Sequence, residues 1–269
     1  IARSGGEVLL KYFGKLTDSQ VELKTSHRDL LTIADSEAEA KVIDLIRSRF
    51  AGHAILGEEN GYIKGTEPYL WVIDPLDGTT NFAHSFPMFA CSVGVLFKGQ
   101  PVAGAVDAPY LRECFGAATG QGAYLNASRI KVSTTPDIKR SLLATGFSYN
   151  RNDVTRNNVD NFSKLILKAH DIRRAGAASL DLCYVAAGRF DGYWEGYLKP
   201  WDVAAGALVV LEAGGRVTDF DGHAGPDSWL WHEHLVASNA LLHEELVGEL
   251  SGKEAGYTGV FHGFAKNFK

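Results

Sequence analysis

Apolar positions recur every three to four residues near both ends of the chain and gather into short β-prone runs in its middle. The spacing between residues 38 and 50 predicts an amphipathic helix over about 36–50, with Asp35 or Ser36 as its N-cap. Between residues 89 and 132, runs separated by Gly, Pro and Asn predict an antiparallel meander. Further helices are predicted over about 1–13, 153–170, 177–187, 202–213 and 240–250, with short strands between them. This order predicts an α/β protein of stacked helical and sheet layers with a mixed sheet.

No internal repeat and no low-complexity linker interrupts this pattern. We therefore predict one domain over residues 1–251. The tail 252–269 mixes Gly, Lys and aromatic residues without periodicity, and we assign it to no element. The chain begins at Ile1 and not at Met, so native residues upstream of it remain an open question.

Bulk composition removes several classes of function. The net charge of −5 argues against a sequence-independent grip on nucleic acid. Three widely spaced cysteines in apolar surroundings predict buried, reduced thiols. No apolar run has the length of a membrane span, and no signal peptide is visible. We therefore predict a cytoplasmic protein with no membrane partner.

The most informative stretch is Trp71 to Asn81, which reads WVIDPLDGTTN. Three apolar residues predict the end of a buried strand, Asp74 follows, and Pro75 bends the chain before Asp77. Such a turn can bring both carboxylates and the Leu76 carbonyl around one point, which suits a hard cation such as Mg²⁺. The next residues predict a helix start, where free amides bind anions. A plain Asp-Gly turn is the alternative for this stretch taken alone.

Acidic residues also follow other short apolar runs or begin a helix. These are Asp35, Glu58 and Asp202, of which Asp202 is predicted as the N-cap of its helix. Strand ends are where α/β sheets place ligand sites, so we expect these side chains to converge. Carboxylates a few Å apart repel by about 1 to 4 kcal/mol per pair, and bound cations would offset that cost.

The sequence contains no nucleophile motif of the phosphatases that form a covalent intermediate, and no P-loop. Direct attack by a metal-activated water is the remaining chemistry. Thr79 could orient or deprotonate that water if a carboxylate, Asp35, held its hydroxyl. A purely structural role for Thr79 at the start of a helix is an equal alternative on local evidence.

Four segments carry a resemblance to a known family. Gly57-Glu58-Glu59, the stretch 71–81, Lys199 to Gly206 (KPWDVAAG) and Glu212 to Gly215 (EAGG) resemble the signatures of the inositol monophosphatase family, in order and spacing, over about residues 23–250. The resemblance implies an αβαβα sandwich of the sugar-phosphatase type with mixed and antiparallel sheets. It also implies a lithium-sensitive, Mg²⁺-dependent phosphomonoesterase with two to three ions per subunit, usually a homodimer.

The same resemblance assigns roles residue by residue. Metal ligands would be Glu58, Asp74, the Leu76 carbonyl, Asp77 and Asp202, and the catalytic set would be Thr79, Asp35 and Glu58. Substrate contacts would come from Asp77, Gly78, Thr79, Gly176, Ala177, Ala178, Glu195 and Asp202, with secondary roles for Glu59 and Lys24.

The predicted substrate is a small phosphorylated polyol, inositol 1-phosphate first. Related branches of the family act on histidinol phosphate, fructose 1,6-bisphosphate or nucleotide phosphates, and these remain alternatives. A non-catalytic metal-binding or regulatory homologue is the alternative of another class. The complete acid set, together with Thr79, favours the enzyme.

Overall fold

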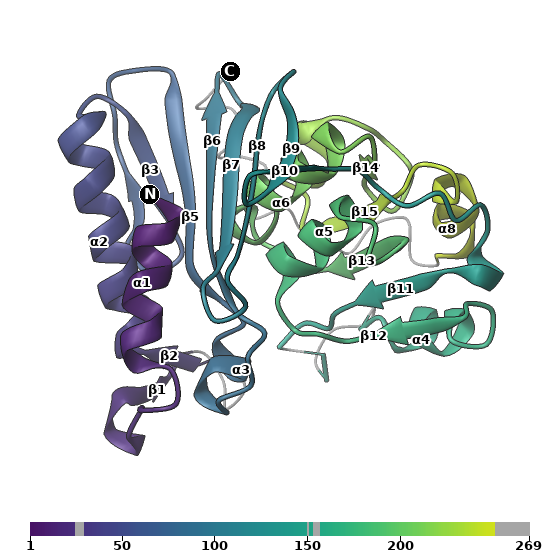
Figure 1. The fold of residues 1–269 in the computed structure, drawn as a ribbon, viewed down its shortest axis with the longest axis horizontal. Helices are drawn as coiled ribbons and strands as arrows, with labels where there is room; N and C mark the ends of the chain where they lie inside the picture. Colours follow the sequence, from purple (N-terminus) through teal and green to yellow (C-terminus); the bar gives the residue numbers. More distant parts are fainter. Residues whose placement is uncertain (25–29, 150, 153–156, 251–269) are drawn as a thin grey trace.

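The computed structural model describes residues 1–24, 30–149, 151–152 and 157–250. Its layers alternate helix, sheet, helix, sheet and helix (Figure 1), which confirms the predicted αβαβα sandwich. The tail 252–269 and the predicted helical residues 153–156 lie outside the described residues. No helix in the described part is long and apolar enough to cross a membrane.

The larger sheet has eight strands in the order β10-β9-β8-β7-β6-β5-β3-β4. All neighbours pair antiparallel except β3 and β5, which are parallel, so the predicted meander is confirmed. The strands are β3 (Ala54–Gly57), β4 (Gly61–Ile63), β5 (Tyr69–Asp77), β6 (Ala90–Phe97), β7 (Gln100–Ala108), β8 (Glu113–Ala118), β9 (Gly122–Leu125) and β10 (Ser128–Ile130).

The second sheet has five strands in the order β12-β11-β13-β15-β14. Strand β11 runs parallel to both of its neighbours, and the other pairs are antiparallel, so this sheet is mixed. The strands are β11 (Leu142–Thr145), β12 (Asp171–Arg173), β13 (Gly192–Gly196), β14 (Arg216–Thr218) and β15 (His234–Ser238). A separate two-stranded sheet pairs β1 (Val21–Leu23) with β2 (Leu30–Thr32).

Helices fill the spaces around the two sheets (Figure 1). The outer pair beside the large sheet is α1 (Ala2–Tyr12) and α2 (Ile33–Arg49), and the pair between the sheets is α5 (Ala178–Ala186) and α6 (Pro200–Glu212). Beyond the small sheet lie α4 (Val159–Leu165) and α8 (His243–Glu249), and two short helices are α3 (Thr79–Ala83) and α7 (Pro226–Trp229). Buried apolar side chains form three clusters: one between the outer helix pair and the large sheet, one around α5 and α6 that reaches both sheets, and one between the small sheet and its outer helices.

Helix α6 packs closely on the large sheet because two strands present glycine to it. A Cβ on Gly94 of β6 would lie 2.8 Å from the Ala204 Cβ, and one on Gly104 of β7 would lie 2.8 Å from the Ala205 Cα. Real side chains do not tolerate such distances, so larger residues there would push the helix away. The close approach fixes the first turn of α6, which carries Asp202, relative to the sheet.

Several of the predicted helices begin or end elsewhere. Helix α2 starts at Ile33, because the Thr32 hydroxyl accepts from the Ala34 amide at 3.2 Å and makes Thr32 the N-cap. Helix α6 starts at Pro200, with Lys199 as N-cap, so the N-cap assignments of Asp35, Ser36 and Asp202 were wrong. Asp35 and Asp202 instead occupy the third helical position and accept from the N-cap amide behind them. Among the described residues of the predicted helix 153–170, α4 covers 159–165.

Candidate active site

The predicted acidic residues come from the ends of β3 and β5 and from the starts of α2 and α6. Strand β5 runs through to Asp77, further than the apolar run predicted, and its pairing with β6 shifts register between Asp74 and Asp77. Pro75 lies inside this irregularity, where its missing N–H interrupts no ladder bond. Asp74 Oδ1 accepts from the Leu76 amide at 3.0 Å, so the side chain itself stabilises the bend.

Gly78 forms the corner between β5 and α3. Its φ of 90° lies in the left-handed region, where a residue without a Cβ is favoured. A Cβ there would also lie 2.7 Å from the Met88 carbonyl oxygen. The corner therefore requires glycine, and it turns the chain so that Thr79 begins α3.

The Asp77 carboxylate lies at the start of α5. Its oxygens accept from the Ala178 amide at 3.1 Å, the Ser179 amide at 2.7 Å and the Ser179 hydroxyl at 2.5 Å. The free amides and positive end of a helix stabilise an anion in this position. The predicted substrate residues Gly176 to Ala178 therefore do lie beside the predicted metal residue Asp77.

Thr79 and Asp35 lie together, as predicted, although they are 44 positions apart in the sequence. Thr79 Oγ1 is 3.3 Å from Asp35 Oδ1 and 3.0 Å from the Leu76 carbonyl oxygen, which share its single proton. Asp35 Oδ2 accepts from both the amide and the hydroxyl of Thr32, at 2.8 and 2.7 Å. Burial raises the pKa of Asp35 to about 7 despite these hydrogen bonds. The pair thus combines a buried hydroxyl with a carboxyl poised near neutral pH.

Glu58 follows the end of β3, and its amide donates to the Ile73 carbonyl of β5 at 3.1 Å. The ammonium of Lys24 lies 2.9 Å from Glu58 Oε1 and also contacts the Glu59 carboxylate. The three side chains are each mostly buried. Lys24 and Glu59 are therefore brought to Glu58, where the resemblance assigned them secondary roles.

The electrostatics of Asp74 and Asp202 show that the carboxylates of Glu58, Asp74, Asp77 and Asp202 lie in one region of the protein. Burial raises the pKa of Asp74 most, followed by the charges of Glu58, Asp77 and Asp202. Burial likewise raises the pKa of Asp202, with Asp77 and Glu58 adding to the shift. Each carboxylate therefore lies within reach of the others' charge. A set of buried oxygen ligands with excess negative charge fits a hard divalent cation.

The spacing of these carboxylates is wide. In the described part of the chain, the only three ligand-bearing side chains with atoms all within 4.8 Å of one another are Asp219, Asp221 and His223. There, Asp219 accepts from the Asp221 and His223 amides at 2.9 and 2.8 Å and contacts the His223 ring at 3.0 Å, so its oxygens already stabilise the local turn. That cluster lies outside the predicted set.

Glu195 lies in β13 and accepts from the Tyr193 hydroxyl at 2.6 Å. Burial raises the pKa of Glu195 to about 7. A Cβ on Gly146 would overlap the Glu195 carboxyl, so glycine at 146 leaves the space that this carboxyl occupies.

Sequence reasoning missed three residues near the site. Ser179 binds Asp77, and its place directly after Ala178 was the available signal. Tyr149 is partly exposed, and desolvation together with the charges of Glu58 and Asp202 raises its pKa, which indicates that it lies near these carboxylates. Asp181 is fully buried, and its Oδ1 has no hydrogen-bond partner among the described residues. No sequence pattern marked the last two.

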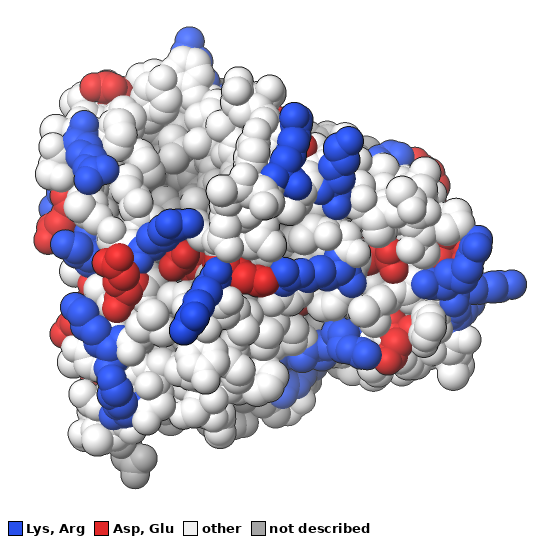
Figure 2. Space-filling view, viewed as in Figure 1, with Lys and Arg blue, Asp and Glu red and all other residues white. Residues whose placement is uncertain are grey.

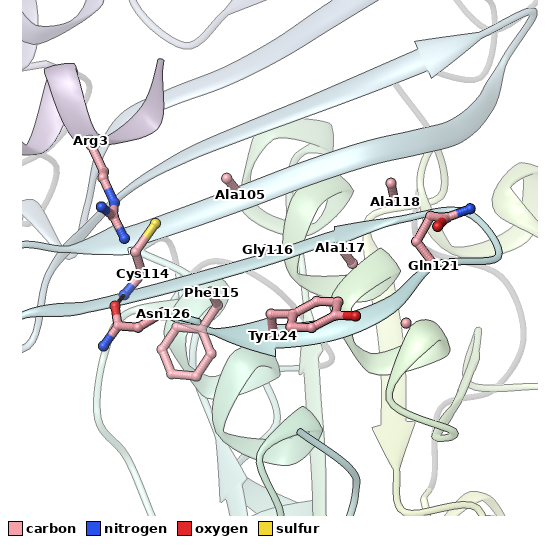
Figure 3. Close-up of a pocket in the computed structure, with 11 residues that line it drawn as sticks. Arg3, Ala105, Cys114, Phe115, Gly116, Ala117, Ala118, Gln121, Tyr124 and Asn126 are labelled. Atoms are coloured by element: carbon pink, nitrogen blue, oxygen red, sulfur yellow. Dashed lines mark hydrogen bonds between the residues drawn. The ribbon is translucent and has the colours of Figure 1, made fainter. Parts of the chain in front are cut away.

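A hollow of about 310 Å³ lies elsewhere, on the exposed face of β7, β8 and β9 (Figure 3). Arg3 reaches toward Cys114 at one end, and Gln121 and Tyr124 lie along the strands. None of the predicted site residues lines it. On the face seen in Figure 2, basic and acidic side chains are interspersed rather than separated into one large field.

We expect chelator-treated protein to become less stable as the pH rises from about 4 to about 7. Asp35 has a raised folded-state pKa of about 7 against 3.8 ordinarily, so within this window the folded state holds a proton that the unfolded state releases. Unfolding then becomes easier by about 1.4 kcal/mol per pH unit for such a carboxyl. Thermal unfolding with chelator at several pH values measures this. A melting temperature that rises with pH across the window would contradict it.

The whole chain is similar to one family of known proteins. The model of the inositol monophosphatase family matches residues 1–254. An inositol-1-monophosphatase of Synechocystis is 43% identical, covering 92% of this chain and 85% of the relative. The Nus factor SuhB of Pseudomonas aeruginosa is 44% identical, covering 91% of each. The solved inositol monophosphatase of Anabaena superposes with a TM-score of 0.84 at 40% identity, covering 94% of this chain and 93% of the other.

Proposed function

Since the chain belongs to the inositol monophosphatase family of phosphoric monoester hydrolases, we propose that it hydrolyses inositol 1-phosphate to inositol and phosphate with Mg²⁺. The observation that carries the proposal is the buried Thr79–Asp35 pair, with the carboxylates of Glu58, Asp74, Asp77 and Asp202 in reach of one another's charge. The carboxylates alone would only bind a cation, and the Thr79–Asp35 pair alone would only orient a water. Hydrolysis requires both parts of the site.

The residues that would hold two to three Mg²⁺ ions are Glu58, Asp74, Asp77, Asp202 and the Leu76 carbonyl, with Glu59 contributing more weakly. Bound Mg²⁺ supplies positive charge that neutralises the phosphate and acidifies water. Asp77 would be one of these ligands, and the α5 amides and Ser179 already hold its carboxylate in one orientation. Lys24 positions the carboxylates of Glu58 and Glu59.

The attacking water is oriented by Thr79. When the Thr79 hydroxyl donates to Asp35 Oδ1, its oxygen is free to accept a hydrogen bond from that water. Asp35 is buried and already receives two hydrogen bonds from Thr32, so its position is fixed before substrate arrives. Proton transfer from the water through Thr79 to Asp35 generates the nucleophile.

The leaving group lies on the side of α5 and β13. The amides of Gly78 and Thr79 begin α3 and bind phosphate. Glu195, with Gly176 to Ala178, would contact the hydroxyl groups of a polyol, and the hydrogen bond that Glu195 accepts from Tyr193 supports this role by holding its carboxyl in one orientation. Membership of the family also supports lithium inhibition and a homodimer, and the dimer would be checked by light scattering.

The test is phosphate release with Mg²⁺ from inositol 1-phosphate, histidinol phosphate, fructose 1,6-bisphosphate and a nucleotide 3′-phosphate, with and without lithium. We expect inositol 1-phosphate to be preferred and lithium to inhibit. Preference for another substrate would contradict the assignment of inositol 1-phosphate but not the proposed chemistry of the site. Relatives named Nus factor SuhB make a non-catalytic role the competing hypothesis. No release from any substrate, with Mg²⁺ bound, would favour that role.

A further inference from the structure

Glu39 is a completely buried carboxylate that the proposed reaction does not use. It lies on α2 one helical turn after Asp35. Its Oε1 has no hydrogen-bond partner among the described residues. A buried carboxylate is costly, so a well-defined set of contacts must offset that cost.

The hydrogen bonds that Glu39 accepts come from the turn that joins β3 and β4. Glu39 Oε2 accepts from the Asn60 amide at 3.0 Å and from the Asn60 side-chain amide at 2.7 Å. On the other side, a Cβ on Gly57 would lie only 1.7 Å from Glu39 Oε1, so glycine at 57 provides the space that the carboxylate fills. The Glu39 carboxylate therefore packs against residues 57–60.

This turn carries both Glu58 and Glu59. On its β3 side the Glu58 amide is anchored to Ile73 of β5, and above it Lys24 contacts the two carboxylates. On its β4 side Asn60 is exposed and is followed by Gly61 with a φ of 65°. The hydrogen bonds from Asn60 to Glu39 attach the β4 side of the turn to α2.

We propose that Glu39 is a positioning residue that fixes the β3–β4 turn, so that Glu58 points into the acidic cluster before a divalent cation arrives. The proposal rests on the proposed role of Glu58 as a metal ligand. Glu39 acts through hydrogen bonds and not through its charge, because the acceptor oxygen facing Asn60 is what holds the turn. A glutamine at 39 can present the same acceptor, whereas an alanine cannot.

The test is Mg²⁺ binding by titration calorimetry, with phosphate release measured separately at saturating Mg²⁺. Glu39→Ala should raise the Kd for Mg²⁺ about tenfold or more, while kcat at saturating Mg²⁺ stays within about threefold. Glu39→Gln should bind Mg²⁺ within about threefold of the wild type. Asp44→Asn is the matched control, since it removes a carboxylate from an exposed position on the same helix and should bind Mg²⁺ normally.

Asn60→Ala serves if Glu39→Ala does not fold, because Asn60 is exposed and only its side-chain hydrogen bond is removed. It should raise the Kd about fivefold, and a Kd within about threefold of the wild type would overturn the proposal. Wild-type affinity in Glu39→Ala, or an equal loss in Glu39→Gln and Glu39→Ala, would also overturn it. If the wild-type protein bound no Mg²⁺, the assignment of Glu58 as a metal ligand would be wrong. That result distinguishes failure of the proposed function from failure of the proposal for Glu39.

Discussion

Replacing Asp77 by asparagine should lower kcat for phosphate release by a factor of about 10³ or more, in a chain that still folds. The carboxylate is buried and receives three hydrogen bonds from the start of α5. Asparagine has nearly the same shape but lacks the negative charge that would bind the cation. Its amide N–H₂ would also face a donor on α5, so the side chain could not keep all its contacts.

Ser179→Ala is the matched control for this variant. It removes one hydrogen bond to the same carboxylate but leaves the charge in place, so the expected loss is about tenfold or less. Circular dichroism and calorimetry would show whether Asp77→Asn retains its fold and loses Mg²⁺ affinity. More than about a tenth of wild-type turnover in Asp77→Asn would remove the metal mechanism as proposed.

The second large effect is expected at Thr79. Thr79→Ala should lower kcat about 10²-fold while the Kd for Mg²⁺ changes little, because the hydroxyl orients water and binds no cation. Thr79→Ser keeps the hydroxyl and should recover most of the turnover. Thr80→Ala is the control, since Thr80 is the exposed neighbour in the same short helix.

Steady-state kinetics at saturating Mg²⁺, together with calorimetry, separate the two roles of Thr79. If Thr79→Ala weakened Mg²⁺ binding and turned over normally at high Mg²⁺, its hydroxyl would be structural, holding the Leu76 carbonyl at 3.0 Å. The alternative that the sequence left open would then be the correct one.

The turn from Asp74 to Thr79 could be predicted because its geometry is local. Pro75, Gly78 and the two carboxylates each restrict the backbone in a way that a short stretch of sequence reveals. The first residues of the helices were harder to predict from the sequence. Asp35 and Asp202 look like N-caps in the sequence, but Thr32 and Lys199 compete for that position, and only the folded backbone decides between them.

Contacts between distant segments were beyond sequence reasoning. Glu39 meets Asn60 across 21 positions, and Ser179 meets Asp77 across 102. Nothing in the residues around Glu39 distinguishes it from the other glutamates of an amphipathic helix. Its burial follows from how α2 packs on the large sheet, which depends on the whole layer.

The contact of Lys24 with Glu58 and Glu59 makes metal uptake an exchange of one cation for another. A divalent ion that binds Glu58 competes with an ammonium group already tethered to the protein. The net binding free energy of the ion at Glu58 is therefore only the difference between its own attraction to the carboxylate and that of the Lys24 ammonium. Added monovalent salt weakens both competitors, so the affinity for Mg²⁺ at this ligand should depend less on ionic strength than the charge of the cluster suggests. The protein thus provides, in Lys24, part of the positive charge that balances its acidic cluster.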